Sequence, residues 1–192
     1  MRHERTVIGY HGCDATVAER LLAGEPFTLS ANNFDWLGRG VYFWEYGADR
    51  ALRFAHDQKA RGKVETPAVV GAVLQLGECF DLLDTDYTSE LATYYPMWEA
   101  MMKDAGLPLP ENAGDAPDHK LRRLDCAVLN WLFDTYDERM GVYYDSVRGG
   151  FTEGPGAFPG SGIQRETHVQ VAIRNPTCIL GVFRPTHRRR TR

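Results

Sequence analysis

The chain has 192 residues, 43% of them hydrophobic, and a formal net charge of −4 at neutral pH. This length supports one core of ordinary size, so we expect a single domain over residues 1–192. The sequence has no run of about 18 apolar residues and no apolar segment behind its charged N-terminus, which argues against membrane contact and predicts a cytoplasmic location.

The four cysteines are dispersed along the chain. Cys13, Cys79, Cys126 and Cys178 have no CxxC spacing, and no cluster of histidines accompanies them. Zinc sites and disulfide frameworks both need such clustering. We therefore expect free thiols and no metal.

The C-terminus carries the one concentration of positive charge. Residues 184–192 contain five arginines and no acidic residue, whereas the chain as a whole is acidic. A basic tail of this kind can contact phosphates, and the alternative is a solvated terminus without a partner.

The first predicted elements are a strand and a helix. Residues 7–10 form an apolar run that predicts a buried strand, ending at His11 and Gly12. Asp14 then stands where a helix N-cap is expected, and Gly24 is the expected end of that helix.

Two further strands follow. Residues 40–44 (GVYFW) predict the second strand, and Asp49 is a candidate N-cap for the next helix. Residues 68–76 (AVVGAVLQL) are β-branched and nearly all apolar, which predicts a central strand covered on both faces.

Apolar residues recur at helical spacing through the middle of the chain, so we expect a helical insertion at about 84–140. Strands return after it, and a glycine-rich loop over 148–162 separates the first of them from the others. The predicted strands are 142–146, 167–173 and 178–183. Strands at both ends of the chain must pair with one another, so the predicted fold class is α+β.

Three sequence motifs together resemble the NAD-binding part of the poly(ADP-ribose) polymerase-like ADP-ribosyltransferases. They are YHG at 10–12, GRGVYF at 38–43 and the small-residue helix ADRALRFA at 48–55. The resemblance covers roughly residues 5–83 and 142–183. It implies a split antiparallel β-sheet core with helices, and NAD as co-substrate.

The resemblance assigns the ligand contacts residue by residue. His11 would hydrogen-bond a hydroxyl of the adenosine ribose, and the backbone of Gly12 would contact the nicotinamide carboxamide. Tyr42 would stack on the nicotinamide ring, with Gly38 and Gly40 allowing the strand to come close.

Further contacts are expected around these residues. Ser30 and Asn32 would belong to the loop over the dinucleotide. Arg50 stands eight residues after Tyr42, where eukaryotic members of the family place a serine that binds the carboxamide. It would face the pyrophosphate or the neighbourhood of Asp49, or lie exposed on its helix.

The third catalytic position departs from the family pattern. The family places a glutamate on a late strand, and the position that corresponds to it here is Gln170. A glutamine can accept a hydrogen bond from the ribose hydroxyl but cannot act as a base, which favours a single transfer over chain elongation. A shift of register by two or four residues would give the role to His168 or Glu166.

The resemblance therefore implies a mono-ADP-ribosyltransferase. It would cleave NAD and transfer ADP-ribose to a macromolecular acceptor, either a protein or a nucleic acid, as a toxin or defence enzyme would. The loop 148–166 would contact the target, with Arg148 beside the acceptor or on the surface. Two alternatives remain, a module that binds NAD or ADP-ribose without turnover and an NAD glycohydrolase.

Overall fold

The computed structural model describes residues 5–114 and 120–186. Residues 187–192, most of the predicted basic tail, lie outside the described residues. The strands are β1 (Thr6–Asp14), β2 (Val41–Glu45), β3 (Pro67–Gln75), β4 (Cys79–Asp81), β5 (Asn112–Ala113), β6 (Leu121–Arg122), β7 (Ser146–Phe151), β8 (His168–Ile173) and β9 (Ile179–Phe183). The helices are α1 (Ala15–Leu22), α2 (Ala48–Ala60), α3 (Thr85–Asp104), α4 (Arg123–Trp131) and α5 (Asp137–Met140), with a π-helical turn at Leu132–Tyr136 and a 3₁₀ turn at Pro176–Cys178.

Seven strands form one sheet in the order β4-β7-β8-β2-β1-β3-β9. All neighbouring pairs are antiparallel except β4 and β7, which run parallel. Strands from the two ends of the chain pair with one another in this sheet, since β8 lies beside β2 and β9 lies beside β3. The predicted α+β class is therefore confirmed as a mostly antiparallel sheet with helices.

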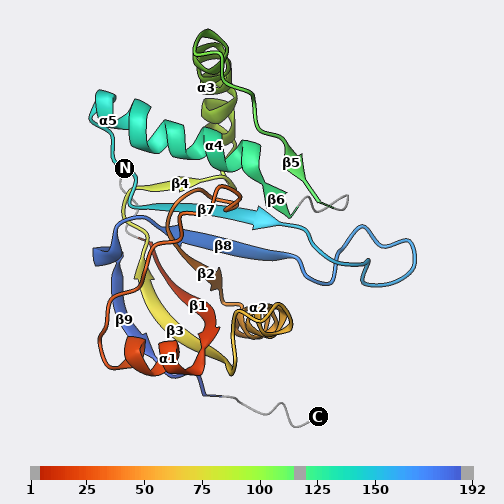
Figure 1. Ribbon diagram of the computed structural model, residues 1–192. Helices are drawn as coiled ribbons and strands as arrows, with labels where there is room; N and C mark the ends of the chain where they lie inside the picture. The colour runs from red at the N-terminus through yellow and green to blue at the C-terminus, as the bar shows by residue number, and fades with distance from the viewer. Residues whose placement is uncertain (1–4, 115–119, 187–192) are drawn as a thin grey trace.

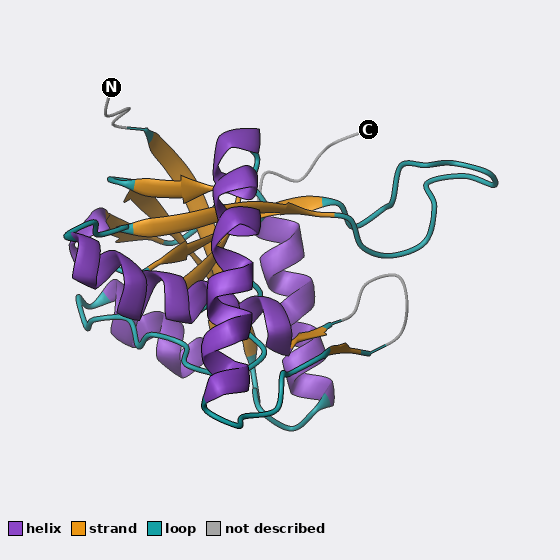
Figure 2. Ribbon diagram, turned by 90° about the horizontal axis from the view of Figure 1, so that it is seen from above, coloured by secondary structure: helices purple, strands orange, loops and turns teal. Residues whose placement is uncertain are grey.

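The helices lie in two groups. Figure 1 shows α3, α4 and α5 gathered over the β4–β7 side of the sheet, while α1 and α2 lie near β1 and β3. The loop between β7 and β8 projects away from the sheet in both Figure 1 and Figure 2. Within the described ranges, no helix has the length and apolar character needed to cross a membrane.

The two faces of the sheet bury different sets of side chains. One face carries Phe43, Leu74 and Val171, each fully buried, in a cluster with their neighbours. The other packs Val147 and Ala172 against the α4 region. Each large apolar side chain removed from water contributes about 1.5–3 kcal/mol, so both faces stabilise the fold.

Asp14 joins β1 to α1 as predicted. Its carboxylate accepts hydrogen bonds from the backbone N–H of Thr16 at 2.9 Å and from those of Glu65 and Thr66 at 2.8 and 2.9 Å. These donors hold the pKa of Asp14 well below its usual range. The prediction for Asp49 was wrong, because Gly47 is the N-cap of α2 and Asp49 lies in its first turn.

The strands differ from the predictions in three ways. β1 continues through His11 and Gly12 to Asp14, because β3 pairs along its whole length. β3 lies second from the edge of the sheet, between β1 and β9, and is not central. β7 begins only at Ser146 and includes the glycines that were predicted as loop.

The glycines of β7 allow close packing within the sheet. A Cβ at Gly149 would come within 3.0 Å of Leu37 and 3.2 Å of Phe151. Gly149 also pairs with Gln170 of β8. Such a run has the composition of a loop but forms a strand because β8 pairs with it, and glycine fits there because the neighbours leave little room for a side chain.

Gly12 lies where α2 crosses β1. A Cβ added there would overlap the backbone carbonyl oxygen of Ala51, an atom that cannot move without displacing α2. Glycine at this position is thus required by the contact between helix and strand.

We expect Gly12→Ala to lower the free energy of unfolding by about 1–3 kcal/mol, the usual cost of overpacking. Gly181→Ala, in β9 with no heavy atom within 4 Å of the added Cβ, is the control and should have little effect. Urea titration measures both. Equal stability of the two variants would contradict the packing described for α2.

Candidate functional site

A cavity of about 700 Å³ opens among β1, β2, β8, α2 and the loop before β2. This volume lies within the range of small-molecule sites in proteins. It collects His11, Ser30, Asn32, Gly40, Tyr42, Arg50 and Gln170, which are all the predicted site residues except Gly12. Side chains separated by up to 159 positions in the sequence, His11 and Gln170, thus line one space.

The cavity begins where β1 and β2 stop pairing. Their register pairs Gly9 with Glu45 and Tyr10 with Trp44. Continuing it would place Gly12 opposite Tyr42, but within the described residues the ladder ends two positions earlier, at Tyr10 and Trp44. The carbonyl of Tyr42 instead accepts a hydrogen bond from Nδ1 of His11 at 2.8 Å.

That hydrogen bond determines the tautomer of His11. A carbonyl oxygen can only accept, so Nδ1 carries the proton and Nε2 keeps its lone pair. Burial lowers the pKa of His11 below its ordinary value, which favours the neutral ring. Phe27 and Phe43 pack against the imidazole, with ring centroids 5.4 and 5.8 Å away. His11 therefore presents a fixed hydrogen-bond acceptor.

Tyr42 supports the turn before its own strand. Its hydroxyl donates to the carbonyl of Gly38 at 2.6 Å and accepts from the N–H of Leu37 at 2.8 Å. Burial raises the pKa of Tyr42 well above its ordinary value, so the phenol stays neutral. With the hydroxyl engaged, the aromatic ring is the part of Tyr42 that remains for a ligand.

The glycines beside Tyr42 have structural reasons of their own. Gly38 adopts φ = 73°, a conformation that favours glycine, and a Cβ there would meet the Asn130 side chain at 2.7 Å. A Cβ at Gly40 would lie 3.0 Å from the carbonyl oxygen of Ile173. The turn and the contact with β8 account for both glycines without a ligand.

Asp35 shapes the loop that covers one side of the cavity. Its carboxylate accepts from the hydroxyl of Ser30 at 2.7 Å and from the backbone N–H of Asn32 at 2.9 Å. Ser30 also exchanges two backbone hydrogen bonds with Gly40. Ser30 and Asn32 are thus held at the cavity by one acidic side chain.

Gln170 lies opposite Trp44 in the register of β2 and β8 and is 8% exposed. His168 Nδ1 donates to the carbonyl of Glu166 at 2.6 Å, so its Nε2 is an acceptor. The amide of Gln170 donates to that Nε2 at 2.8 Å. This leaves the Gln170 Oε1 to accept from a ligand.

The three residues predicted as alternatives for the third catalytic position lie in different places. Gln170 lines the cavity, whereas His168 orients the Gln170 amide from the side. Glu166 lies before β8 and contributes its backbone carbonyl to His168. Burial lowers the pKa of His168 below its ordinary value, so this arrangement uses a neutral imidazole.

A buried carboxylate that the sequence did not reveal also lines the cavity. Glu153, 2% exposed, stands two residues after β7, and its Oε2 accepts from the Arg50 guanidinium at 2.7 Å. Arg50 is therefore neither exposed nor free. Its partner lies 103 positions away in a glycine-rich loop, where no local pattern marks an acidic residue as a site residue.

Aromatic rings and cations complete the lining. The aromatic residues are Phe34, Trp36, Tyr42, Trp44 and Phe54, and the cations besides Arg50 are Arg61, Lys63 and Lys120. The indole N–H of Trp44 and the Nε–H of Arg50 are buried with no hydrogen-bond partner among the described residues. This combination suits a ligand with flat rings and anionic groups.

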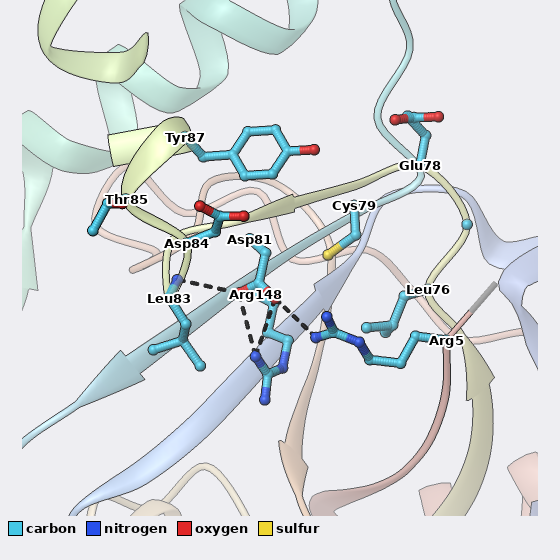
Figure 3. Close-up of a pocket in the computed structure, with 11 residues that line it drawn as sticks. Arg5, Leu76, Glu78, Cys79, Asp81, Leu83, Asp84, Thr85, Tyr87 and Arg148 are labelled. Carbon is cyan, nitrogen blue, oxygen red and sulfur yellow. Dashed lines mark hydrogen bonds and ion pairs between the residues drawn. The ribbon is translucent and has the colours of Figure 1, made fainter. Parts of the chain in front are cut away.

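A second cavity, of about 540 Å³, lies at the β4 side of the sheet (Figure 3). Asp81 accepts there from Arg5 at 2.9 Å and from Arg148 at 3.1 Å, and Arg148 also bonds Glu45 at 2.6 Å. These charges satisfy one another. Arg148 therefore belongs to a structural network, not to the first cavity.

Among the residues that the structure describes, no group of three or more histidine, cysteine, aspartate or glutamate side chains is arranged to hold a metal ion. Comparisons of the chain with protein-family models, with curated proteins and with solved structures found no match.

The two buried histidines predict how stability depends on pH. Because their pKa values in the folded protein lie below the ordinary 6.5, the unfolded chain binds more protons in the interval below 6.5. Stability should therefore fall as the pH drops from about 7.5 to about 5.5. His11→Gln and His168→Gln should each flatten this slope in urea titrations, whatever they do to stability at neutral pH.

The exposed His56 supplies the control. His56→Gln should leave the slope unchanged. An unchanged slope in the His11 and His168 variants as well would contradict the neutral, buried state of both rings.

Proposed function

We propose that the protein is an NAD-dependent mono-ADP-ribosyltransferase, which breaks the bond between nicotinamide and ribose and transfers ADP-ribose to a macromolecule. One observation carries this proposal. His11, Tyr42 and Gln170 come from three different strands and line the same cavity, which opens where β1 and β2 part.

The geometry of each side chain supports the role that the resemblance gives it. His11 offers an Nε2 lone pair, which would accept from a hydroxyl of the adenosine ribose. The ring of Tyr42 would pack on the nicotinamide. The Oε1 of Gln170 would accept from the 2′-hydroxyl of the nicotinamide ribose, since the amide N–H is used by His168.

Gly12 fits its assigned role through its backbone alone. The carbonyl of Ile8 accepts from Tyr46 N–H and so faces β2, and alternation along β1 turns the N–H and C=O of Gly12 to the same side. Because the ladder ends before Gly12, these groups would serve the carboxamide of nicotinamide.

The chemistry asks more of orientation than of acid catalysis. As the glycosidic bond breaks, its electron pair stays on the ring nitrogen and nicotinamide leaves neutral, while positive charge develops on the ribose. A site that holds both rings and both riboses lowers the barrier by positioning. Gln170 has no charge and would take part only as a hydrogen-bond acceptor.

The acceptor would approach beside the loop between β7 and β8, residues 152–167. This loop projects from the sheet (Figure 1) and exposes Phe158 and Ile163, at 61% and 68%. Apolar side chains on a projecting loop suit contact with a large partner. The proposed partner is accordingly a protein or a nucleic acid, as for a toxin or defence enzyme of the cytoplasm.

Nicotinamide release from NAD by the purified protein tests the proposal, with and without added cell lysate or RNA. We expect release that rises with a suitable acceptor. Tyr42→Ala and Gln170→Ala should each lower the rate by about 100-fold, or about 2.7 kcal/mol in barrier height. Tyr143→Ala, at a tyrosine that is 68% exposed, should retain the full rate. Absence of release in every mixture would contradict the proposal.

A further inference from the structure

Glu153 is an unusual residue for a cavity wall, because its carboxylate is buried at 2% exposure and yet borders the open space. Its Oε2 accepts from Arg50 at 2.7 Å and lies 3.5 Å from Nδ1 of His168. Its Oε1 has the Lys120 ammonium at 3.8 Å, beyond hydrogen-bond distance. One carboxylate oxygen is thus held by Arg50, while the other has no hydrogen-bond donor within reach among the described residues.

The other acids of the cavity are already accounted for. Both carboxylate oxygens of Asp35 accept hydrogen bonds from Ser30 or Asn32. Asp57 lies exposed on α2, where water screens its charge. Glu153 is therefore the acidic residue of this wall that is both buried and incompletely used.

Stability alone does not account for this charge pair. Burying a carboxylate and a guanidinium costs solvation that their attraction rarely exceeds, and an apolar pair of similar size often stabilises a protein as well. A buried ion pair at the edge of a ligand-sized cavity is a better argument for chemistry than for stability.

The surroundings of Glu153 also connect it to Gln170. His168 lies between the two, with Nδ1 3.5 Å from the carboxylate and Nε2 2.8 Å from the Gln170 amide. The uncharged glutamine and the arginine of α2 are the two departures from the family pattern. Arg50 contacts Glu153 directly, and Gln170 is connected to it through His168.

We propose that Glu153 supplies the carboxylate of the transfer reaction, a role that rests on the proposed function. The acceptor's nucleophilic atom forms its bond to C1′ of the ribose while the C1′–nitrogen bond breaks, and the electron pair of that bond leaves with neutral nicotinamide. The proton of the acceptor passes to Oε1 of Glu153 and then to water. The negative charge also stabilises the positive charge that develops on the ribose.

In this arrangement the neighbouring residues have separate tasks. Arg50 fixes one oxygen of Glu153 through a charge-assisted hydrogen bond, which leaves the other oxygen to accept the proton of the acceptor. His168 acts as a positioning residue, because it orients Gln170 through a hydrogen bond without lining the cavity itself.

The test compares Glu153→Gln with Glu153→Asp in the nicotinamide-release assay, each with its NAD affinity from calorimetry and its unfolding temperature. We expect Glu153→Gln to lose at least about 100-fold in rate while NAD binds within about threefold of the wild type. Glu153→Asp, which keeps the charge, should recover part of that loss.

Chemical rescue measures an effect on rate that is not expected if Glu153 has only a structural role. Glu153→Ala leaves room for a small carboxylate, so sodium formate should raise its rate at least about tenfold over sodium chloride at equal ionic strength. This arm also serves if Glu153→Gln folds poorly, because the formate effect is measured within one variant.

The matched control is Asp81→Asn, which removes another buried carboxylate that pairs with arginines but lies outside the cavity. Asp81→Asn should lower the free energy of unfolding. The folded variant should release nicotinamide at the wild-type rate, and formate should not raise that rate.

The outcomes separate the two proposals. A wild type that releases nicotinamide, with Glu153→Gln equally active or Glu153→Ala insensitive to formate, overturns the role of Glu153 and leaves the transferase standing. A wild type that binds NAD but never releases nicotinamide overturns the proposed function, and the role of Glu153 with it.

Discussion

The cavity depends on the hydrogen bond from His11 to the carbonyl of Tyr42. A β-sheet normally satisfies each backbone carbonyl with a neighbouring strand, and a strand that parts from its neighbour must satisfy that carbonyl in another way. Here the imidazole provides the donor at 2.8 Å. The same bond ends the β1–β2 ladder, opens the space between the strands and sets the tautomer of His11. Phe27 and Phe43 then hold the ring in place.

The buried charges in and near the site form ion pairs with one another. Glu45 and Arg148 neutralise each other beside the second cavity, and their ion pair links β2 to β7 across the intervening β8. Arg50 and Glu153 form the corresponding pair at the ligand-sized cavity, but there one carboxylate oxygen lacks a donor within the described residues. The carboxylate oxygen without a donor is the reason to propose a catalytic role for the Arg50–Glu153 pair and a structural role for the Glu45–Arg148 pair.

Local features of the sequence predicted local structure well. The cap of α1 by Asp14 could be predicted because the capping hydrogen bond joins residues only two positions apart. The residues His11, Tyr42 and Gln170, which line one cavity, were predicted from the resemblance of dispersed motifs to a family and not from local features of the sequence. What the sequence could not predict depends on distant partners: Gly149 belongs to a strand only because β8 pairs with it. For the same reason Glu153 could not be distinguished from an ordinary loop acid before Arg50 was placed beside it.

A crystal structure of the protein with a non-hydrolysable NAD analogue tests the central claim most directly, because it asks where the dinucleotide binds. The account predicts the adenosine ribose within hydrogen-bond distance of Nε2 of His11, and the nicotinamide ribose between Tyr42 and Gln170 with its reacting carbon facing Glu153. Binding in the cavity of Figure 3, or a cavity around His11 that stays empty at saturating analogue, would contradict it.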